Sequence, residues 1–68
     1  MRPNLKQARL DKGMTQQQVA DHLGITLRNY QKLEAGELLG RIAHWDKLED
    51  LFAIHQRVLR EKDQEANQ

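Results

Sequence analysis

The sequence predicts an all-α fold, and three observations on its first half predict it. Apolar residues recur at helical spacing in two groups, Val19–Leu23 and Tyr30–Leu33. Thr15 and Thr26, the only threonines of the chain, each precede one of these groups at a place where a side-chain oxygen can cap a helix. Gly24 stands between the groups, where a left-handed residue would end the first helix. We therefore expect short helices separated by tight turns.

The first helix is expected to run from Pro3 or Asn4 to Lys12. Proline suits the first turn of a helix, and Gly13 supplies the stop. Arg9 is unusual in this helix because its position lies near the apolar side. Its charge either finds a partner within the fold or reaches out to solvent along its aliphatic stem.

Two further helices are expected over about residues 16–35. Thr15 and Gln18 fit the capping box, in which the cap side chain and the third helical residue bond to each other's backbone. Ala20 is small where a second helix would cross closely, and Ile25 fills the turn from inside. A helix, a short glycine turn and a second helix at a steep angle form the helix-turn-helix motif.

The outer face of the second of these helices is basic and rich in amides. Arg28 and Lys32 lie almost opposite Tyr30 and Leu33 on the helical wheel, and Asn29 and Gln31 lie on the flanks. Arginine and lysine can bind guanine in the major groove, and asparagine or glutamine can bind adenine. An ordinary solvated surface is the alternative, but the two caps, the small residue and the glycine together favour the motif.

The segment from Leu5 to Gly36 resembles the Cro/CI-type helix-turn-helix domains of phage repressors and their bacterial relatives. The matching residues are Leu5, Arg9, Gly13, Thr15, Gln16, Val19, Ala20, Leu23, Gly24, Ile25, Thr26, Tyr30, Leu33, Glu34 and Gly36. The resemblance implies a five-helix bundle that binds operator DNA, usually as a symmetric dimer. It also implies that Arg9 pairs with Glu34 and so clamps the first helix to the end of the recognition helix.

The expected DNA contacts follow from this placement. Gln16, at the start of its helix, should meet a phosphate, because backbone N–H groups and the helix dipole favour an anion there. Leu27 could pack on a thymine methyl group. The full set of expected DNA-binding residues is Thr15, Gln16, Gln17, Leu27, Arg28, Asn29, Gln31 and Lys32.

The segment after the motif is traced more loosely. The two leucines of the 37–40 loop are expected to find cover. A helix from Arg41 or Ile42 to Phe52 carries an apolar stripe. This stripe comprises Ile42, Trp45, Leu48, Leu51 and Phe52. Trp45 could stack on a base, although an aromatic residue on such a stripe is more often part of the core.

A last helix is expected from His55 to about Lys62. Its apolar residues Ile54, Val58 and Leu59 exceed what a short terminal helix needs for docking. They either form a dimer interface, as in the family that the chain resembles, or complete the small core.

Length and composition bound the remaining possibilities. Sixty-eight residues allow one domain, expected over residues 1–62, followed by a polar tail at 63–68. There is no cysteine, and no apolar run resembles a signal peptide or a membrane span, so we expect a cytoplasmic protein. The net charge of +1 conceals an asymmetry, because residues 1–33 carry +4 and residues 34–68 carry −3. The half that contains the motif is thus the basic half.

Two functions from different classes remain. The first is a sequence-specific transcriptional regulator, a repressor that binds a palindromic operator as a homodimer, which could form only once the chains are on double-stranded DNA. The second is a small helical interaction module or antitoxin-like protein whose main target is another protein. We expect no enzyme, metal site, cofactor or small-molecule ligand, because the chain lacks serine and cysteine nucleophiles and its three histidines lack ligand spacing.

Overall fold

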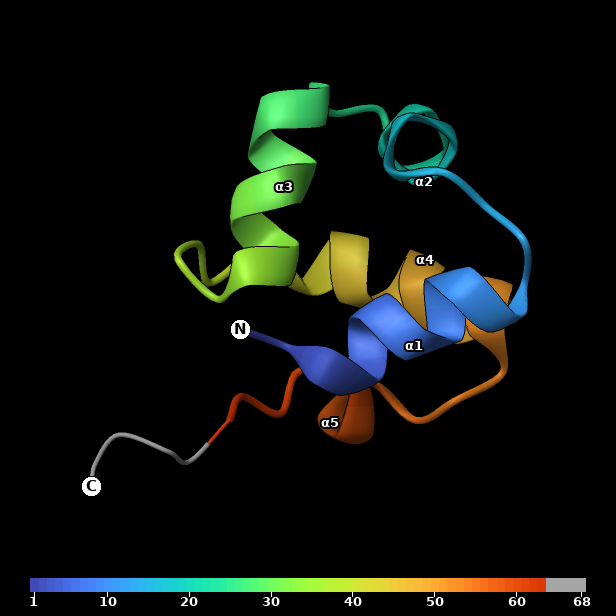
Figure 1. Ribbon diagram of the computed structural model, residues 1–68, viewed down its shortest axis with the longest axis vertical. Helices are drawn as coiled ribbons and strands as arrows, with labels where there is room; N and C mark the ends of the chain where they lie inside the picture. The colour runs from blue at the N-terminus through green and yellow to red at the C-terminus, as the bar shows by residue number, and fades with distance from the viewer. Residues whose placement is uncertain (64–68) are drawn as a thin grey trace.

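The computed structural model describes residues 1–63 and contains five helices in that range (Figure 1). The predicted polar tail therefore lies, beyond Asp63, outside the described residues. The helices are α1 (Pro3–Asp11), α2 (Gln16–Leu23), α3 (Leu27–Ala35), α4 (Ile42–Phe52) and α5 (Gln56–Leu59). The all-α class predicted from the sequence is confirmed. The last helix is shorter than predicted, since it ends at Leu59 rather than near Lys62.

The caps that were predicted for α2 and α3 are present. The Thr15 hydroxyl accepts a hydrogen bond from the Gln18 backbone N–H at 3.1 Å, and the Gln18 side chain accepts one from the Thr15 N–H at 2.8 Å. Thr26 caps α3 by accepting from the Asn29 N–H at 3.1 Å. Gly24 ends α2 with a φ of 75°, a left-handed conformation in which a side chain would be strained. These local signals fix where the two helices start and where the first one stops.

The core lies where all five helices meet, and each helix contributes at least one fully buried residue. Trp45 is 1% exposed, and its indole N–H donates to the Leu39 carbonyl at 3.0 Å. Trp45 is therefore a core residue, and the base-stacking alternative does not apply to it. The buried apolar residues are Leu5, Ala8, Val19, Ala20, Leu23, Tyr30, Leu33, Trp45, Leu48, Phe52 and Leu59.

Two predictions about apolar residues near the start of α4 were wrong. Ile42 was placed on the buried stripe of α4 but is 73% exposed, because as the first helical residue it precedes the turn that reaches the core. The leucines of the 37–40 loop do not find full cover either, since Leu38 is 38% and Leu39 is 76% exposed. The loop is held by its backbone carbonyls instead, which accept from Arg2 and Trp45.

The predicted dimer surface also needs a correction. Leu59 is fully buried, because α5 packs against both α1 and α4 and turns this side chain into the core. It is therefore unavailable to a second chain. Ile54 packs partly against the core, and Val58 keeps 37% of its surface exposed. Of the two alternatives for these residues, completion of the core holds for Leu59.

Arg2 joins three parts of the fold that are distant in sequence. Its side chain is 1% exposed, donates to the backbone carbonyls of Leu33, of Leu38 at 2.8 Å and of Arg60 at 3.1 Å, and lies 5.1 Å from the centroid of the Trp45 ring. The segment before α1 thereby fixes the carboxyl end of α3, where a positive charge also complements the helix dipole. This role of Arg2 was not predicted from the sequence, because the residue precedes the first helical pattern.

Candidate nucleic-acid interface

The α2–α3 pair has the arrangement of a helix-turn-helix. The two helices pack against each other and are joined by the short turn at Gly24–Thr26. In Figure 1, α2 is seen nearly end-on while α3 stands upright beside it, so the helices cross steeply. The outer side of α3 is left uncovered by the rest of the bundle. A helix held in this way can enter the major groove.

The exposed side of α3 carries the side chains that were expected to read DNA. Arg28, Asn29 and Gln31 are exposed, and Leu27 and Lys32 are half-buried. Within residues 1–63, the side chains of Arg28, Asn29 and Lys32 form no hydrogen bond or ion pair, so their donors are free for a ligand. The orientation of α3 thus places two cations, Arg28 and Lys32, on its outer face, with the uncommitted Asn29 amide at one flank, four residues before the buried Leu33.

The residues expected at the start of α2 differ from one another in what they already bind. Thr15 is committed to the capping box through its hydroxyl. Gln17 is exposed and donates to the Asp21 carboxylate at 2.9 Å, one turn along the helix. Gln16 is half-buried and turns inward, where its amide nitrogen donates to a carboxylate oxygen of Glu34 at 3.1 Å. That inward bond was not expected from the sequence.

A buried ion pair connects α1 to the end of α3. Arg9 Nε lies 2.8 Å from Glu34 Oε2 and Arg9 Nη2 lies 3.2 Å from Glu34 Oε1, a two-point contact between the guanidinium and the carboxylate. Arg9 Nη1 also donates to the Met14 carbonyl at 3.0 Å, and the Tyr30 hydroxyl donates to Glu34 Oε2 at 2.8 Å. Arg9 and Glu34 are 8% and 4% exposed. The pairing that the family resemblance implied is present.

The protonation states of this cluster are fixed by burial and mutual hydrogen bonding. Burial tends to raise the pKa of the Glu34 carboxyl, but donors on Arg9, Tyr30 and Gln16 outweigh it and hold this pKa below the ordinary value. The hydrogen bond to Glu34 raises the pKa of Arg9, and burial followed by the hydrogen bond to Glu34 raises the pKa of the Tyr30 hydroxyl. Glu34 is therefore a carboxylate at neutral pH, and it can only accept.

The network continues from Glu34 to the exposed side of α3. Gln16, whose nitrogen bonds Glu34, accepts through its own Oε1 from Gln31 Nε2 at 3.3 Å. Gln31 belongs to the outer strip of α3, three and four residues after Arg28 and Leu27, and positions at that spacing share a helix face. A buried charge is thus linked by two glutamines to the surface that would face DNA.

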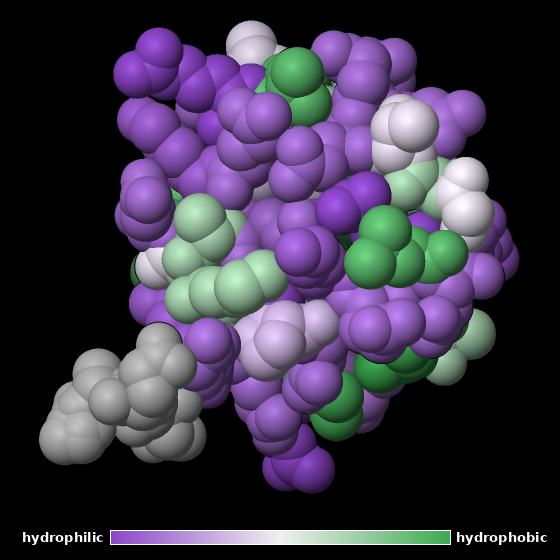
Figure 2. Space-filling view, in the orientation of Figure 1, coloured by the Kyte–Doolittle hydropathy of each residue, from purple (hydrophilic) through white to green (hydrophobic). Residues whose placement is uncertain are grey.

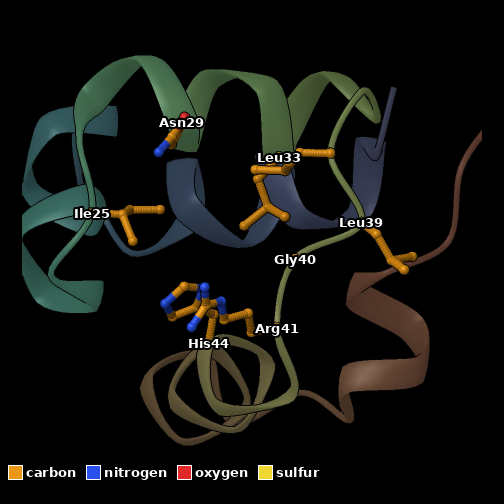
Figure 3. A pocket seen from close by; sticks show the side chains of 8 residues that line it. Ile25, Asn29, Leu33, Leu39, Gly40, Arg41 and His44 are labelled. Atoms are coloured by element: carbon orange, nitrogen blue, oxygen red, sulfur yellow. The ribbon is translucent and has the colours of Figure 1, made fainter.

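A cavity of about 550 Å³ lies beside α3 rather than on its outer face. Figure 3 shows Ile25, Asn29 and Leu33 on its α3 side, and on the opposite side Arg41, the residue before α4, and His44 of α4. The 37–40 loop closes one end. Figure 2 shows a mostly hydrophilic face on which hydrophobic groups occur separately. The exposed Leu39 lines this cavity next to the candidate interface.

Comparison with known proteins supports the same assignment. A family model described as helix-turn-helix matches residues 5–55, a range that contains all but the first two residues of α1 and the whole of α2, α3 and α4. No match was found among curated proteins or among solved structures. Within the described part of the chain, no helix has both the length and the apolar character that crossing a membrane requires. No three metal-ligating side chains come together in that part either.

Proposed function

The chain belongs to the helix-turn-helix family of the Cro/CI type and is a DNA-binding regulator, and we propose that it is a repressor that inserts α3 into the major groove of a palindromic operator. The uncommitted basic face of α3, held by the buried Arg9–Glu34 pair, is the observation that carries this proposal. Because neither Arg28 nor Lys32 has an internal partner among residues 1–63, their charges are available to guanine or phosphate.

The proposed roles divide between phosphate contacts and base contacts. The start of α2, with Thr15, Gln16 and Gln17, meets a phosphate through its unbonded backbone N–H groups, and the second N–H of the Gln16 amide adds to this contact. Leu27, Arg28, Asn29, Gln31 and Lys32 face base edges. The phosphate contacts set the position of the protein, and the base contacts select the sequence.

Selection of bound duplexes from a random pool, followed by binding titrations, tests this proposal. Arg28→Ala should weaken operator binding by about 1–3 kcal/mol and relax the preference at one base-pair position. Lys47→Ala removes one exposed charge from α4, outside the proposed interface, and should leave that preference intact. Uniform weakening by Arg28→Ala over all sequences would make Arg28 a phosphate contact, and failure to enrich any duplex would refute sequence-specific binding.

We further propose that two chains bind together on the operator. One recognition helix reads too few base pairs to single out a site in a genome, whereas a two-fold dimer reads two half-sites about 34 Å apart. Ile54, between α4 and α5, and Val58, on α5, form the surface that is available for pairing. Because this surface is small, it suits pairing on DNA rather than in free solution. Val58→Glu should abolish cooperative binding to the full palindrome and preserve binding to one half-site. Unchanged binding to the full site would place the dimer elsewhere.

A protein-interaction module is the second candidate, and one observation favours it. Leu39 and Ile42 are each more than 70% exposed near the cavity between α3 and α4. Salt dependence separates the two candidates, because phosphate contacts make DNA binding fall steeply as salt rises. Duplex binding that is absent at low salt would favour the interaction module, whereas steeply salt-dependent, sequence-selective binding favours the repressor.

A further inference from the structure

The hydrogen bonds that run from Glu34 to Gln31 have a direction that the buried charge imposes. Glu34 Oε2 accepts from Arg9 and Tyr30, and Oε1 accepts from Arg9 and Gln16. A carboxylate has no proton to donate. Gln16 must therefore present its NH₂ group, and not its carbonyl oxygen, to Glu34.

This requirement propagates to the next glutamine. With its nitrogen bound to Glu34, Gln16 has its carbonyl oxygen left for Gln31, and an oxygen can only accept. Gln31 must then turn its own NH₂ group toward Gln16, as the 3.3 Å contact between Gln31 Nε2 and Gln16 Oε1 shows. The carbonyl oxygen of Gln31 then has no partner among residues 1–63 and lies on the side of the amide away from the bond to Gln16, while the NH₂ group keeps one further N–H.

We propose, resting on the proposed function, that Glu34 and Gln16 orient Gln31 so that it offers an acceptor to the major groove and selects a base with an amino group. Cytosine N4 and adenine N6 provide such a donor, whereas guanine and thymine present only acceptors there. A free glutamine could flip its amide to suit either class. Here Glu34 and Gln16 are positioning residues, and Gln31 is the residue that contacts the base.

The first experiment locates the position that Gln31 reads. Duplexes selected from a random pool are resynthesised with each of the four base pairs at every position, and binding is measured for the parent and for Gln31→Ala. The position at which Gln31→Ala loses discrimination is the one of interest. The parent should prefer cytosine or adenine there over guanine or thymine by about three- to tenfold, the range that one net hydrogen bond supplies.

Variants of Gln31 and Gln16 then test the direction. Gln31→Glu, which can only accept, should keep the preference for cytosine or adenine, and Gln31→Lys, which can only donate, should reverse it to guanine. Gln16→Met should lower discrimination at this position to the level of Gln31→Ala and leave the other positions unchanged. Equal weakening over all sequences would instead make Gln16 a phosphate contact alone and overturn its positioning role. Gln7→Met is the control: it removes the hydrogen bond from the Gln7 amide to the Asp11 carboxylate on α1, which resembles the bond from Gln16 to Glu34, and it should change no base preference.

A measurement without DNA tests the network itself. Hydrogen exchange of the side-chain amide protons, followed by nuclear magnetic resonance, should be slower for Gln16 than for Gln7, because Gln16 is half-buried against a carboxylate and Gln7 bonds Asp11 at the surface. Equal rates would remove the basis of the inference. So would full discrimination in a folded Gln16→Met, or a parent preference for guanine or thymine. Failure to enrich any duplex would overturn the proposed function as well.

Discussion

Removal of Arg9 should destabilise the domain far more than removal of any exposed cation on α1. Arg9→Met keeps the aliphatic stem but deletes two donors to the Glu34 carboxylate and one to the Met14 carbonyl. Glu34, 4% exposed, would then keep only the Tyr30 hydroxyl and the Gln16 amide as partners for a full negative charge. The loss therefore includes the cost of leaving a buried charge without its counter-ion.

The expected magnitude is set by burial. Breaking a buried ion pair by removing one partner costs about 3–5 kcal/mol. A chain of 68 residues has a total free energy of unfolding of about 3–10 kcal/mol. Arg9→Met should consequently remove a large part of the stability of the domain, whereas Lys6→Met, an exposed position on the same helix, should change stability by about 0.5 kcal/mol or less.

Urea unfolding followed by circular dichroism measures these differences, and a double-mutant cycle isolates the pair. Glu34→Gln should be costly in the parent because it strands the Arg9 guanidinium, and much cheaper in the Arg9→Met background, where no buried charge remains. The double variant should therefore lose about 2 kcal/mol or more less stability than the sum of the losses of the two single variants. Additive costs, within about 0.5 kcal/mol, would refute the clamp.

Three other perturbations test separate parts of the fold. Because the pKa of Glu34 is lowered in the folded state, its carboxylate stabilises the domain at neutral pH, and this stability should be lost progressively as the pH falls below about 4.3, the ordinary pKa of a glutamate. Urea unfolding at a series of pH values should show that Glu34→Gln loses less stability in acid than the parent. Ala53 ends α4 at a φ of 57°, so Ala53→Gly should raise the melting temperature by relieving about 1 kcal/mol of strain, whereas Ala43→Gly within α4 should lower it. Arg2→Met removes one donor from each of three backbone carbonyls, of which the Leu33 carbonyl keeps the Gly36 N–H, and should cost about 2–4 kcal/mol in thermal unfolding. The exposed Arg57→Met should be nearly neutral.

With the proposed role of Gln31 in base recognition, the stability of the domain and its base specificity both depend on Glu34. Glu34 holds α1 to α3 through Arg9, and through Gln16 it also sets which end of the Gln31 amide faces outward. Variants at Glu34 should therefore alter both properties, whereas variants at Gln31 should alter recognition alone. This difference makes Gln31 the better position at which to change base preference without loss of the fold.

Local patterns in the sequence were sufficient for the helices that bear the candidate site. Threonine caps and left-handed glycines act through contacts within a few residues, so Thr15, Thr26 and Gly24 predicted the ends of α2 and the start of α3. The outward direction of Arg28 also followed from the sequence, because helical periodicity alone opposes it to Tyr30. The Arg9–Glu34 pair came from family resemblance rather than from any local signal.

Features that depend on contacts distant in sequence were decided only by the tertiary structure. Helical periodicity indicates which residues share a face but not where a helix enters the core. For this reason Ile42 was misplaced, and the choice between a dimer surface and the core for Leu59 was decided only by the fold. The Arg2 guanidinium finds its carbonyls 31 to 58 residues away, beyond any local pattern. Likewise, the sequence determined that α3 presents arginine, lysine and amides. The direction of the Gln31 amide, however, depends on the Glu34 carboxylate that folding buries beside Gln16, because a buried charge is costly unless it is hydrogen-bonded to donors.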